Sequence, residues 1–138
     1  TFLATAGLNR LGLDVGAVSI DPGEMLPAVA QGAIGIERRA DDDAMTAMLA
    51  PIHETLTGTQ LAAERAFLAE LDGSCQTPIA ALAEVDGARL SLRGQILAVD
   101  GSRSFEEALS GPVAEAAEVG RRLAAALLDR AGPGFLAG

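Results

Sequence analysis

Cys75 has the greatest potential for covalent chemistry in this 138-residue sequence, which contains one cysteine. It lies in a predicted loop at 72–78, directly after a predicted helix, and loops carry attacking groups more often than cores do. A reactive cysteine needs a nearby cation or helix N-terminus, whereas here a helix C-terminus and the acidic Asp72 oppose the thiolate. On residue type alone, Cys75 is open to three roles: a buried bystander, a reactive nucleophile or an attachment point.

His53 and the acidic residues form no conventional catalytic or metal site. One histidine and one cysteine exclude the common zinc constellations and an internal disulfide. No motif surrounds His53, so a cysteine-protease arrangement has no support. The acidic run at 41–43 lacks the alternating oxygen ligands of a calcium loop and instead predicts a helix start.

All ten basic residues are arginines, and 19 acidic residues leave a net charge of −9. Arginine can hold a carboxylate through two parallel hydrogen bonds, although a lysine-free, alanine-rich chain also follows from genomic base composition. The negative charge argues against nucleic acid and anionic membrane as partners. No apolar run approaches the roughly 20 residues of a membrane span, and no export signal is visible, which predicts a cytosolic protein.

The first 51 residues predict short elements of a larger unit. Thr1 is followed at once by a helical pattern, which predicts that the chain begins inside a longer protein. Pro51 interrupts the pattern and is the expected boundary between two lobes. The expected elements are a helix at 2–12 ending at Gly12, a strand at 18–20, a turn at 21–23, a buried strand at 33–37 and a helix from 41–43 to Leu49.

Residues from about 52 onward predict a small α+β domain with a three-stranded antiparallel sheet and helices on one face. Two Asp-Gly pairs, at 86–87 and 100–101, separate the strands and favour hairpins, and Gly73 is expected to end the first helix in a left-handed conformation. The expected elements are a helix at 59–71, strands at 79–85, 89–99 and 104–109, and a helix at 112–129. The spacing on the first helix selects Leu61, Ala62, Arg65, Leu68 and Leu71 as one face.

Three blocks of sequence resemble the porphobilinogen deaminase (hydroxymethylbilane synthase) family, in family order. The first is Ala-Gly-Leu-Asn-Arg-Leu-Gly at 6–12, and the second is Leu-Pro-Ala-Val-Ala-Gln-Gly-Ala-Ile-Gly-Ile-Glu at 26–37. The third comprises His-Glu-Thr at 53–55, Ala-Glu-Arg-Ala-Phe-Leu at 63–68 and Gly-Ser-Cys-Gln-Thr-Pro-Ile at 73–79. The resemblance covers nearly the whole chain and fades over the last twenty or so residues.

The resemblance implies a transferase of porphyrin and haem biosynthesis that condenses four porphobilinogen units into linear hydroxymethylbilane and releases ammonia. Cys75 matches the cysteine that holds a dipyrromethane cofactor through a thioether. Sulfur is soft enough to capture the electrophilic carbon left when porphobilinogen loses ammonia, and the thioether then survives many cycles. The growing chain extends from this primer, so the loop must move or the lobes must shift.

Other site residues also follow from the resemblance. Arg10 matches an arginine near the acidic groups of cofactor and substrate, and Arg39 matches a family arginine and is the second candidate for substrate binding. Gln31 and Gly32 match a Gln-Gly pair that approaches the pyrrole site. For Arg10 the alternative is a helix-end arginine bound to carbonyls, and for Arg39 an ion pair with an acid. Glu37, Glu64 and Arg65 are expected to be structural. Ala30 departs from the family, which usually has glycine there, and one residue is missing between Arg10 and Gln31.

The family fold implies that residues 1–51 end a two-lobe α/β region of the periplasmic-binding-protein type. Within it, 1–32 belong to the second lobe and 33–51 cross back to the first, while 52–138 form the cofactor-bearing domain. The family's catalytic aspartate, in a Ser-x-Lys-Asp stretch, does not occur in this sequence, so no catalytic residue is assigned and the chain alone is expected to be inactive. The expected partners are porphobilinogen, the growing oligopyrrole and the rest of a monomeric enzyme. A catalytically inactive pyrrole-binding scaffold and a thiol-dependent redox or acyl-transfer protein are the alternatives.

Overall fold

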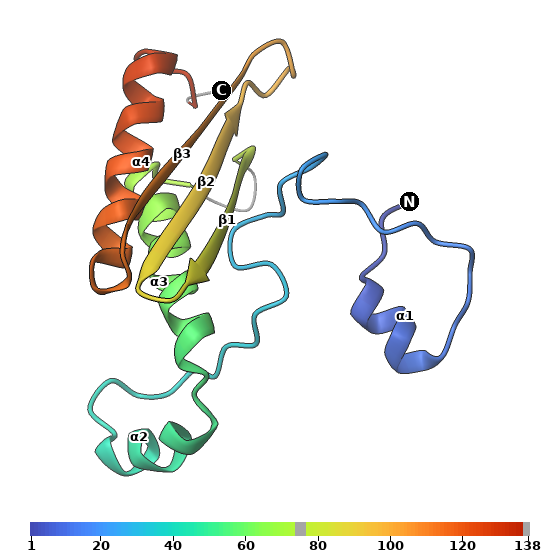
Figure 1. Ribbon diagram of the computed structural model, residues 1–138, viewed down its shortest axis with the longest axis vertical. Helices are drawn as coiled ribbons and strands as arrows, with labels where there is room; N and C mark the ends of the chain where they lie inside the picture. The colour runs from blue at the N-terminus through green and yellow to red at the C-terminus, as the bar shows by residue number, and fades with distance from the viewer. Residues whose placement is uncertain (74–76, 137–138) are drawn as a thin grey trace.

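The computed structural model describes residues 1–73 and 77–136, and Figure 1 shows a sheet with two long helices beside an extended N-terminal part. The N-terminal part has two short helices, α1 and α2. The C-terminal part has two long helices and three strands. In chain order the elements are α1 Thr5–Leu11, α2 Asp43–Leu49, the 3₁₀ turn η1 Ala50–Ile52, α3 Thr55–Glu70, β1 Ile79–Asp86, β2 Arg89–Leu97, β3 Ser104–Pro112, the 3₁₀ turn η2 Val113–Glu115 and α4 Ala116–Ala131.

The three strands form an antiparallel meander in the order β1-β2-β3. Both predicted hairpins are confirmed: Asp86 pairs with Arg89 across the first turn, and Leu97 pairs with Ser104 across the second. The alternation along β2 defines its inward face: Leu90, Leu92, Gly94 and Ile96 are buried, while the alternate residues Ser91, Arg93 and Gln95 are only partly covered.

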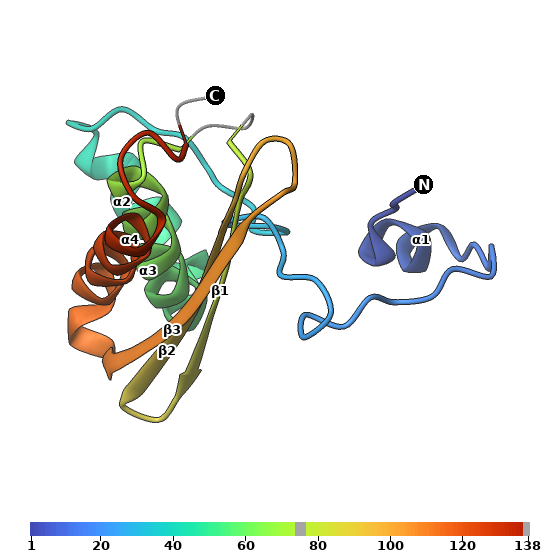
Figure 2. The same cartoon turned by 90° about the horizontal axis from the view of Figure 1, so that it is seen from above.

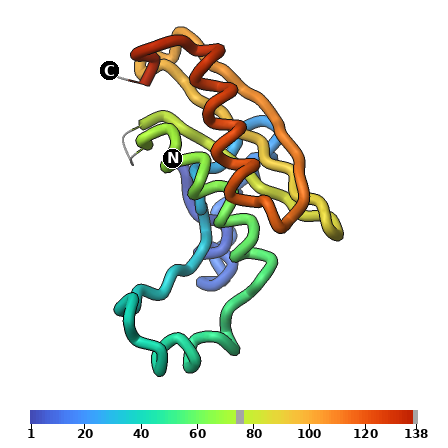
Figure 3. The backbone as a smooth tube through the Cα atoms, turned by 90° about the vertical axis from the view of Figure 1, so that its left-hand side faces the viewer, coloured from blue at the N-terminus to red at the C-terminus, as the bar shows by residue number. Residues whose placement is uncertain are grey.

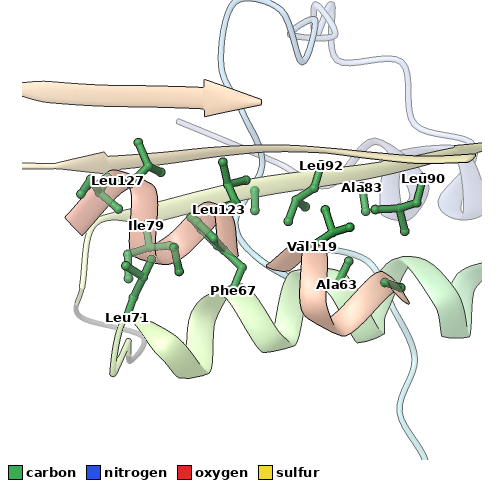
Figure 4. Close-up of a cluster of buried hydrophobic side chains, with 14 of the residues drawn as sticks. Ala63, Phe67, Leu71, Ile79, Ala83, Leu90, Leu92, Val119, Leu123 and Leu127 are labelled. Atoms are coloured by element: carbon green, nitrogen blue, oxygen red, sulfur yellow. The ribbon is translucent and has the colours of Figure 1, made fainter. Parts of the chain in front are cut away.

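Helices α3 and α4 cover one face of this sheet, as Figures 1 and 2 show, so the predicted α+β domain is confirmed. Phe67 of α3 and Leu123 of α4 meet the strand side chains in one continuous core (Figure 4). The two helices approach closely at Gly120, where a Cβ atom would lie 2.2 Å from the carbonyl oxygen of Ala63. The core therefore depends on a backbone-to-backbone helix contact as well as on apolar side chains.

The two N-terminal strand predictions are wrong for this structure. Residues 18–20 and 33–37 are not strands, and they are not buried: Val18 is 88% exposed and Ile34 is 95% exposed. A strand needs a hydrogen-bonded neighbour, and none of the described strands reaches either segment. The turn at 21–23 is confirmed, since the backbone N–H of Glu24 donates to the carbonyl oxygen of Asp21.

Both predicted N-terminal helices are present. Gly12 ends α1 in the left-handed conformation, although α1 begins at Thr5 and not at residue 2. Asp42 caps α2 by accepting a hydrogen bond from the backbone N–H of Met45. Neither helix contains a buried residue, and Figure 3 shows the stretch around α2 looping away from the two packed helices.

Helix α3 differs from its prediction at its start and on its face. It begins at Thr55, four residues early, because the Glu54 carboxylate accepts hydrogen bonds from the backbone N–H groups of Leu56 and Thr57. Its buried face contains Ala63, Glu64 and Phe67, whereas the predicted Ala62 and Arg65 are exposed. The sheet and α4 select this face, and the apolar pattern of α3 alone is too weak to define it.

Helix α4 agrees with its prediction more closely: it spans Ala116–Ala131 where 112–129 was expected, and its buried residues include Ala116, Gly120, Leu123 and Leu127. The turn η2 precedes it and begins directly after Pro112. None of the helices in the described ranges is both long enough and apolar enough to cross a bilayer.

Candidate functional site

Cys75, the predicted attachment residue, lies outside the described residues, so its surroundings are defined by the chain on either side of 74–76. Before it, α3 ends in a double hydrogen-bonded turn: Asp72 N–H donates to the oxygen of Ala69, and Gly73 N–H donates to the oxygen of Leu68. The left-handed residue of this turn is Asp72, with φ 51°, and not Gly73 as predicted.

From Thr77 onward the chain is fixed to the sheet. Ile79 N–H donates to the carbonyl oxygen of Thr77 at 2.8 Å, and Leu97 N–H donates to the oxygen of Pro78 at 3.0 Å. Ile79 is buried and opens β1. Both ends of the predicted attachment loop are therefore anchored on the C-terminal domain.

A C-terminal turn lies beside these anchored ends. A cleft is lined by Leu71, Asp72 and Thr77 on one side and by Pro133, Phe135 and Leu136 on the other. Phe135 is buried and meets the ring of Phe105 edge to face, with 5.2 Å between ring centroids. Sequence reasoning missed this turn, because the resemblance fades there; the available signal was an isolated aromatic residue after Gly-Pro-Gly.

The predicted Gln31–Gly32 pair lies on a tight turn beside β1 and α3. Gln31 N–H donates to the oxygen of Ala28 at 3.1 Å, and Ala33 N–H donates to the oxygen of Ala30 at 3.2 Å. Gly32 has φ 79°, and no atom lies within 4 Å of the position its Cβ would occupy. A ligand therefore has open access to the Gly32 backbone. Ala30, the departure from the family, also has a positive φ of 59°.

Glu64 connects this turn to the C-terminal domain. It is buried, and its carboxylate accepts hydrogen bonds from the backbone N–H of Ala30 at 2.8 Å and of Ala83 at 2.9 Å. The prediction that Glu64 is structural gave no partners. The available sequence signal for such partners was a charged residue three positions before Phe67, on the same side of the helix.

Arg10 and Arg39 do not meet Gln31 in this structure. Arg10 is exposed in the last turn of α1, and Figures 1 and 2 show α1 apart from the sheet and its helices. Arg39 is exposed shortly before α2, and neither arginine lines the clefts that Gln31 borders. Within the described residues neither guanidinium forms an ion pair. The exposed Arg65 forms none there either, so the expectation that it pairs with an acid of another lobe stays a prediction. Both Arg10 and Arg39 can therefore bind carboxylates.

Two exposed carboxylates have a lowered pKa. Hydrogen bonds from the side chain and backbone of Thr57 lower the pKa of Glu54, the cap of α3. Hydrogen bonds from the side chain and backbone of Ser102 lower the pKa of Asp100 in the second hairpin turn. Both pKa values are lowered by turn and cap geometry, which gives no sign of acid–base chemistry. No group of three metal-ligating side chains occurs at 1–73 or 77–136.

Comparison with known proteins extends over nearly the whole chain. Residues 1–47 match the family description "Porphobilinogen deaminase, dipyromethane cofactor binding domain", and residues 59–129 match "Porphobilinogen deaminase, C-terminal domain". The chain belongs to the porphobilinogen deaminase family. Arg10, Gln31, Gly32 and Arg39 fall in the first of these regions of the family, and Cys75 falls in the second.

Curated relatives carry the name porphobilinogen deaminase. The protein from Paracoccus denitrificans is 55% identical over 136 residues, which are 98% of this chain and 44% of that relative. The proteins from Nitrobacter hamburgensis and Nitrobacter winogradskyi are 49% and 48% identical, over 98% of this chain and 43% of each relative. The chain thus spans less than half the length of the curated relatives it matches.

Proposed function

We propose that this chain is the C-terminal part of a hydroxymethylbilane synthase, a cytosolic transferase of tetrapyrrole biosynthesis that joins four porphobilinogen molecules and releases ammonia. The observation that carries the proposal is 55% identity to a porphobilinogen deaminase over 98% of the chain. Within this identity, Cys75 stands in the Gly-Ser-Cys-Gln-Thr-Pro block that resembles the family's attachment loop. We propose 1–51 as the end of the two-lobe region and 52–138 as the cofactor-bearing domain.

The donor set of the described residues fits an anionic pyrrole cofactor. Each pyrrole ring carries two carboxylates, and the exposed, unpaired guanidinium groups of Arg10 and Arg39 can each hold one through two hydrogen bonds. The open surface at Gly32 lets a flat ring approach the backbone. A bound dipyrromethane supplies the pyrrole carbon from which the product chain is extended.

Each residue of this chain has a distinct role in the proposal. Cys75 would form one carbon–sulfur bond to the methylene carbon from which ammonia has departed, its thiol proton passing to the nitrogen of that pyrrole ring, and would afterwards take no part in turnover. Arg10 and Arg39 orient carboxylates, and Gln31 offers an amide next to Gly32 for hydrogen bonds to the pyrrole system. Proton transfer needs a carboxylate that this chain does not provide, because the family's Ser-x-Lys-Asp stretch is absent from its sequence.

The two-lobe part of the proposal is supported by the distribution of exposed apolar side chains. Val18, Ile34 and Ile36 are 88%, 95% and 58% exposed, and all three lie in the segments that the sequence predicts as strands. Strand partners supplied by the rest of an enzyme would cover them, with 1–32 in the second lobe and 33–51 returning to the first.

The intact mass of the full-length enzyme tests this proposal. We expect the wild-type protein to be heavier than its sequence by one dipyrromethane and Cys75→Ser to lack both the extra mass and hydroxymethylbilane synthesis. Ala125→Ser, at an exposed site on α4, is the matched control and should keep both. A wild-type protein that makes hydroxymethylbilane without the extra mass would contradict the role of Cys75.

The 138-residue chain on its own is expected to produce no hydroxymethylbilane from porphobilinogen. The reason is the missing proton-transfer carboxylate and not a folding defect, because the C-terminal domain has a continuous hydrophobic core of its own. Hydroxymethylbilane formed by the isolated chain would contradict the proposal that proton transfer requires a carboxylate from the rest of the enzyme.

A further inference from the structure

Glu64 is the one buried charged residue among the described positions, with 7% of its surface exposed. A buried carboxylate is destabilising unless hydrogen bonds compensate for the water that it loses. No ion pair in the described part of the chain involves Glu64, so its compensation comes from backbone donors. These donors belong to two segments distant in sequence, which makes Glu64 a connection between them.

One connection is to β1. Ala83 lies on the edge of β1 opposite to β2, and its N–H donates to Oε1 of Glu64 at 2.9 Å. The other is to the turn that carries Gln31, where Ala30 N–H donates to Oε2 at 2.8 Å. Each carboxylate oxygen is thus used once, and hydrogen bonds to a charged acceptor are roughly twice as strong as neutral ones.

The residues before Ala30 attach to the same edge of β1. Ala81 N–H donates to the oxygen of Pro27 at 3.1 Å, and Ala28 pairs with Ala80 in an antiparallel bridge. Leu26 is buried, and Val29 packs against the core. The turn is therefore fixed to the C-terminal domain, while α1 and α2 on either side of it have no buried residue.

We infer that Glu64 is a positioning residue that holds the Gln31–Gly32 turn at a constant place relative to the Cys75-bearing domain. The significance of that turn rests on the proposed function, in which Gln31 and Gly32 face the pyrroles. In this inference the turn keeps its place relative to the C-terminal domain through Glu64 and through the contacts of residues 27–28 with β1.

Glu64→Gln tests this inference with little change of shape. The glutamine amide has one acceptor oxygen, and its NH₂ group cannot accept from a backbone N–H, so Ala30 or Ala83 loses its acceptor. Gln60→Leu is the matched control, because Gln60 donates to the carbonyl oxygen of the same Ala83 at 2.9 Å but does not bond the turn.

Hydrogen exchange followed by mass spectrometry on the 138-residue chain gives the first readout. In Glu64→Gln we expect amides at 29–33 to exchange at least tenfold faster, with β2 and α4 unchanged, whereas Gln60→Leu leaves 29–33 unchanged. Unchanged exchange at 29–33 in Glu64→Gln, or equal acceleration throughout the domain, would overturn the inference.

Kinetics of the full-length enzyme give the second readout. Glu64→Gln should retain the mass of the bound cofactor but lose at least fivefold in kcat/KM for porphobilinogen, and Gln60→Leu should stay within twofold of wild type. A kcat/KM unchanged despite faster exchange at 29–33 refutes the positioning role. Failure of the proposed function is distinguishable, because then wild type lacks the cofactor mass while the exchange result stands.

Discussion

At the scale of single residues, the candidate site divides into residues that the chain itself holds and residues that it leaves exposed. Gln31 and Gly32 are held by backbone hydrogen bonds and by Glu64, whereas Arg10 and Arg39 are exposed and unpaired in the described chain. Ala30 belongs to the held residues: its N–H donates to Glu64, and its backbone adopts a conformation that suits glycine.

Ala30→Gly is expected to stabilise the chain. Ala30 has φ 59°, and a side chain in the left-handed region costs about 1–2 kcal/mol, partly offset by the greater freedom of glycine in the unfolded chain. We expect a net gain of about 0.5–1 kcal/mol in the free energy of unfolding, measured by urea denaturation.

Ala33→Gly is the control for this change, since Ala33 lies in the same turn without a positive φ and should gain nothing. An equal gain in both variants, or a loss in Ala30→Gly, would show that the left-handed conformation of Ala30 carries no strain.

The identities of the candidate site residues stay predictions, and the arrangement of their surroundings was only partly predictable from sequence. Cys75, Arg10, Gln31 and Gly32 were selected by blocks of residues around them. The partners of Glu64 were not, because a helix residue that bonds the backbone of Ala30 and Ala83 leaves no trace in local spacing. Such contacts are set by tertiary packing.

At the scale of elements, predictions succeeded where local signals were sufficient. The hairpins follow from Asp-Gly turns and from alternation along β2, both of which act within a few residues. The strand predictions at 18–20 and 33–37 failed because a strand depends on neighbours that can be far away in sequence. The prediction of the buried face of α3 was partly wrong for a related reason, because contacts with α4 and the sheet determine which side of the helix is buried.

Gly120→Ala is expected to destabilise the domain through the contact between α3 and α4. The added Cβ would lie 2.2 Å from the Ala63 oxygen, which is backbone and cannot turn away. Overpacking of this kind costs about 1–3 kcal/mol, which outweighs the gain of about 1 kcal/mol from better helix propensity. Thermal denaturation of the variant should show a clear decrease in Tm.

Gly58→Ala, on α3, provides the comparison for Gly120→Ala. Its Cβ would meet the end of the His53 side chain at 2.8 Å, and this side chain can rotate. We expect the Tm to stay level or rise. Equal losses in the two variants would mean that the helix contact at Gly120 is not specially close.

The cap of α3 gives a pH dependence. Hydrogen bonds from Thr57 and Leu56 lower the pKa of Glu54 below its usual 4.5. A lowered folded-state pKa means that the stabilisation is complete above the unfolded value and is lost as pH falls through the folded value. Glu54→Ala should therefore have a lower Tm than wild type at pH 7, and the difference should shrink as pH falls below about 4.5.

A constant difference in Tm between wild type and Glu54→Ala from pH 7 to pH 3 would contradict this cap. Glu70→Ala is the control, because Glu70 is an exposed residue at the other end of α3 and should show no such convergence.

At the scale of the whole molecule, apolar exposure separates two regions. Large hydrophobic side chains that are exposed fall almost entirely in residues 2–56, and Val99 is the exception within the described residues. The C-terminal helices and strands surround one continuous core, while α1 and α2 contribute nothing to it.

Hydrogen exchange of the wild-type chain should reproduce this separation. Isolated helices shorter than about 12 residues are marginal in water, so the 7-residue helices α1 and α2 should exchange nearly as fast as an unfolded peptide. Amides in α4 and β2 should exchange at least about 1000-fold more slowly, equivalent to about 4 kcal/mol of opening free energy. Strong protection in α1 would show that it packs on the domain.

The packing of Phe135 against Phe105 offers a fluorescence probe of the C-terminal turn. The sequence contains no tryptophan or tyrosine, so Phe135→Trp would give the chain a single indole fluorophore. Packed on Phe105 and beneath the guanidinium of Arg103, this indole should emit at shorter wavelength than one in water. Because Phe135 shares a cleft with Asp72 and Thr77, the emission would report, without a chemical label, whether loading of Cys75 dislodges the C-terminal turn.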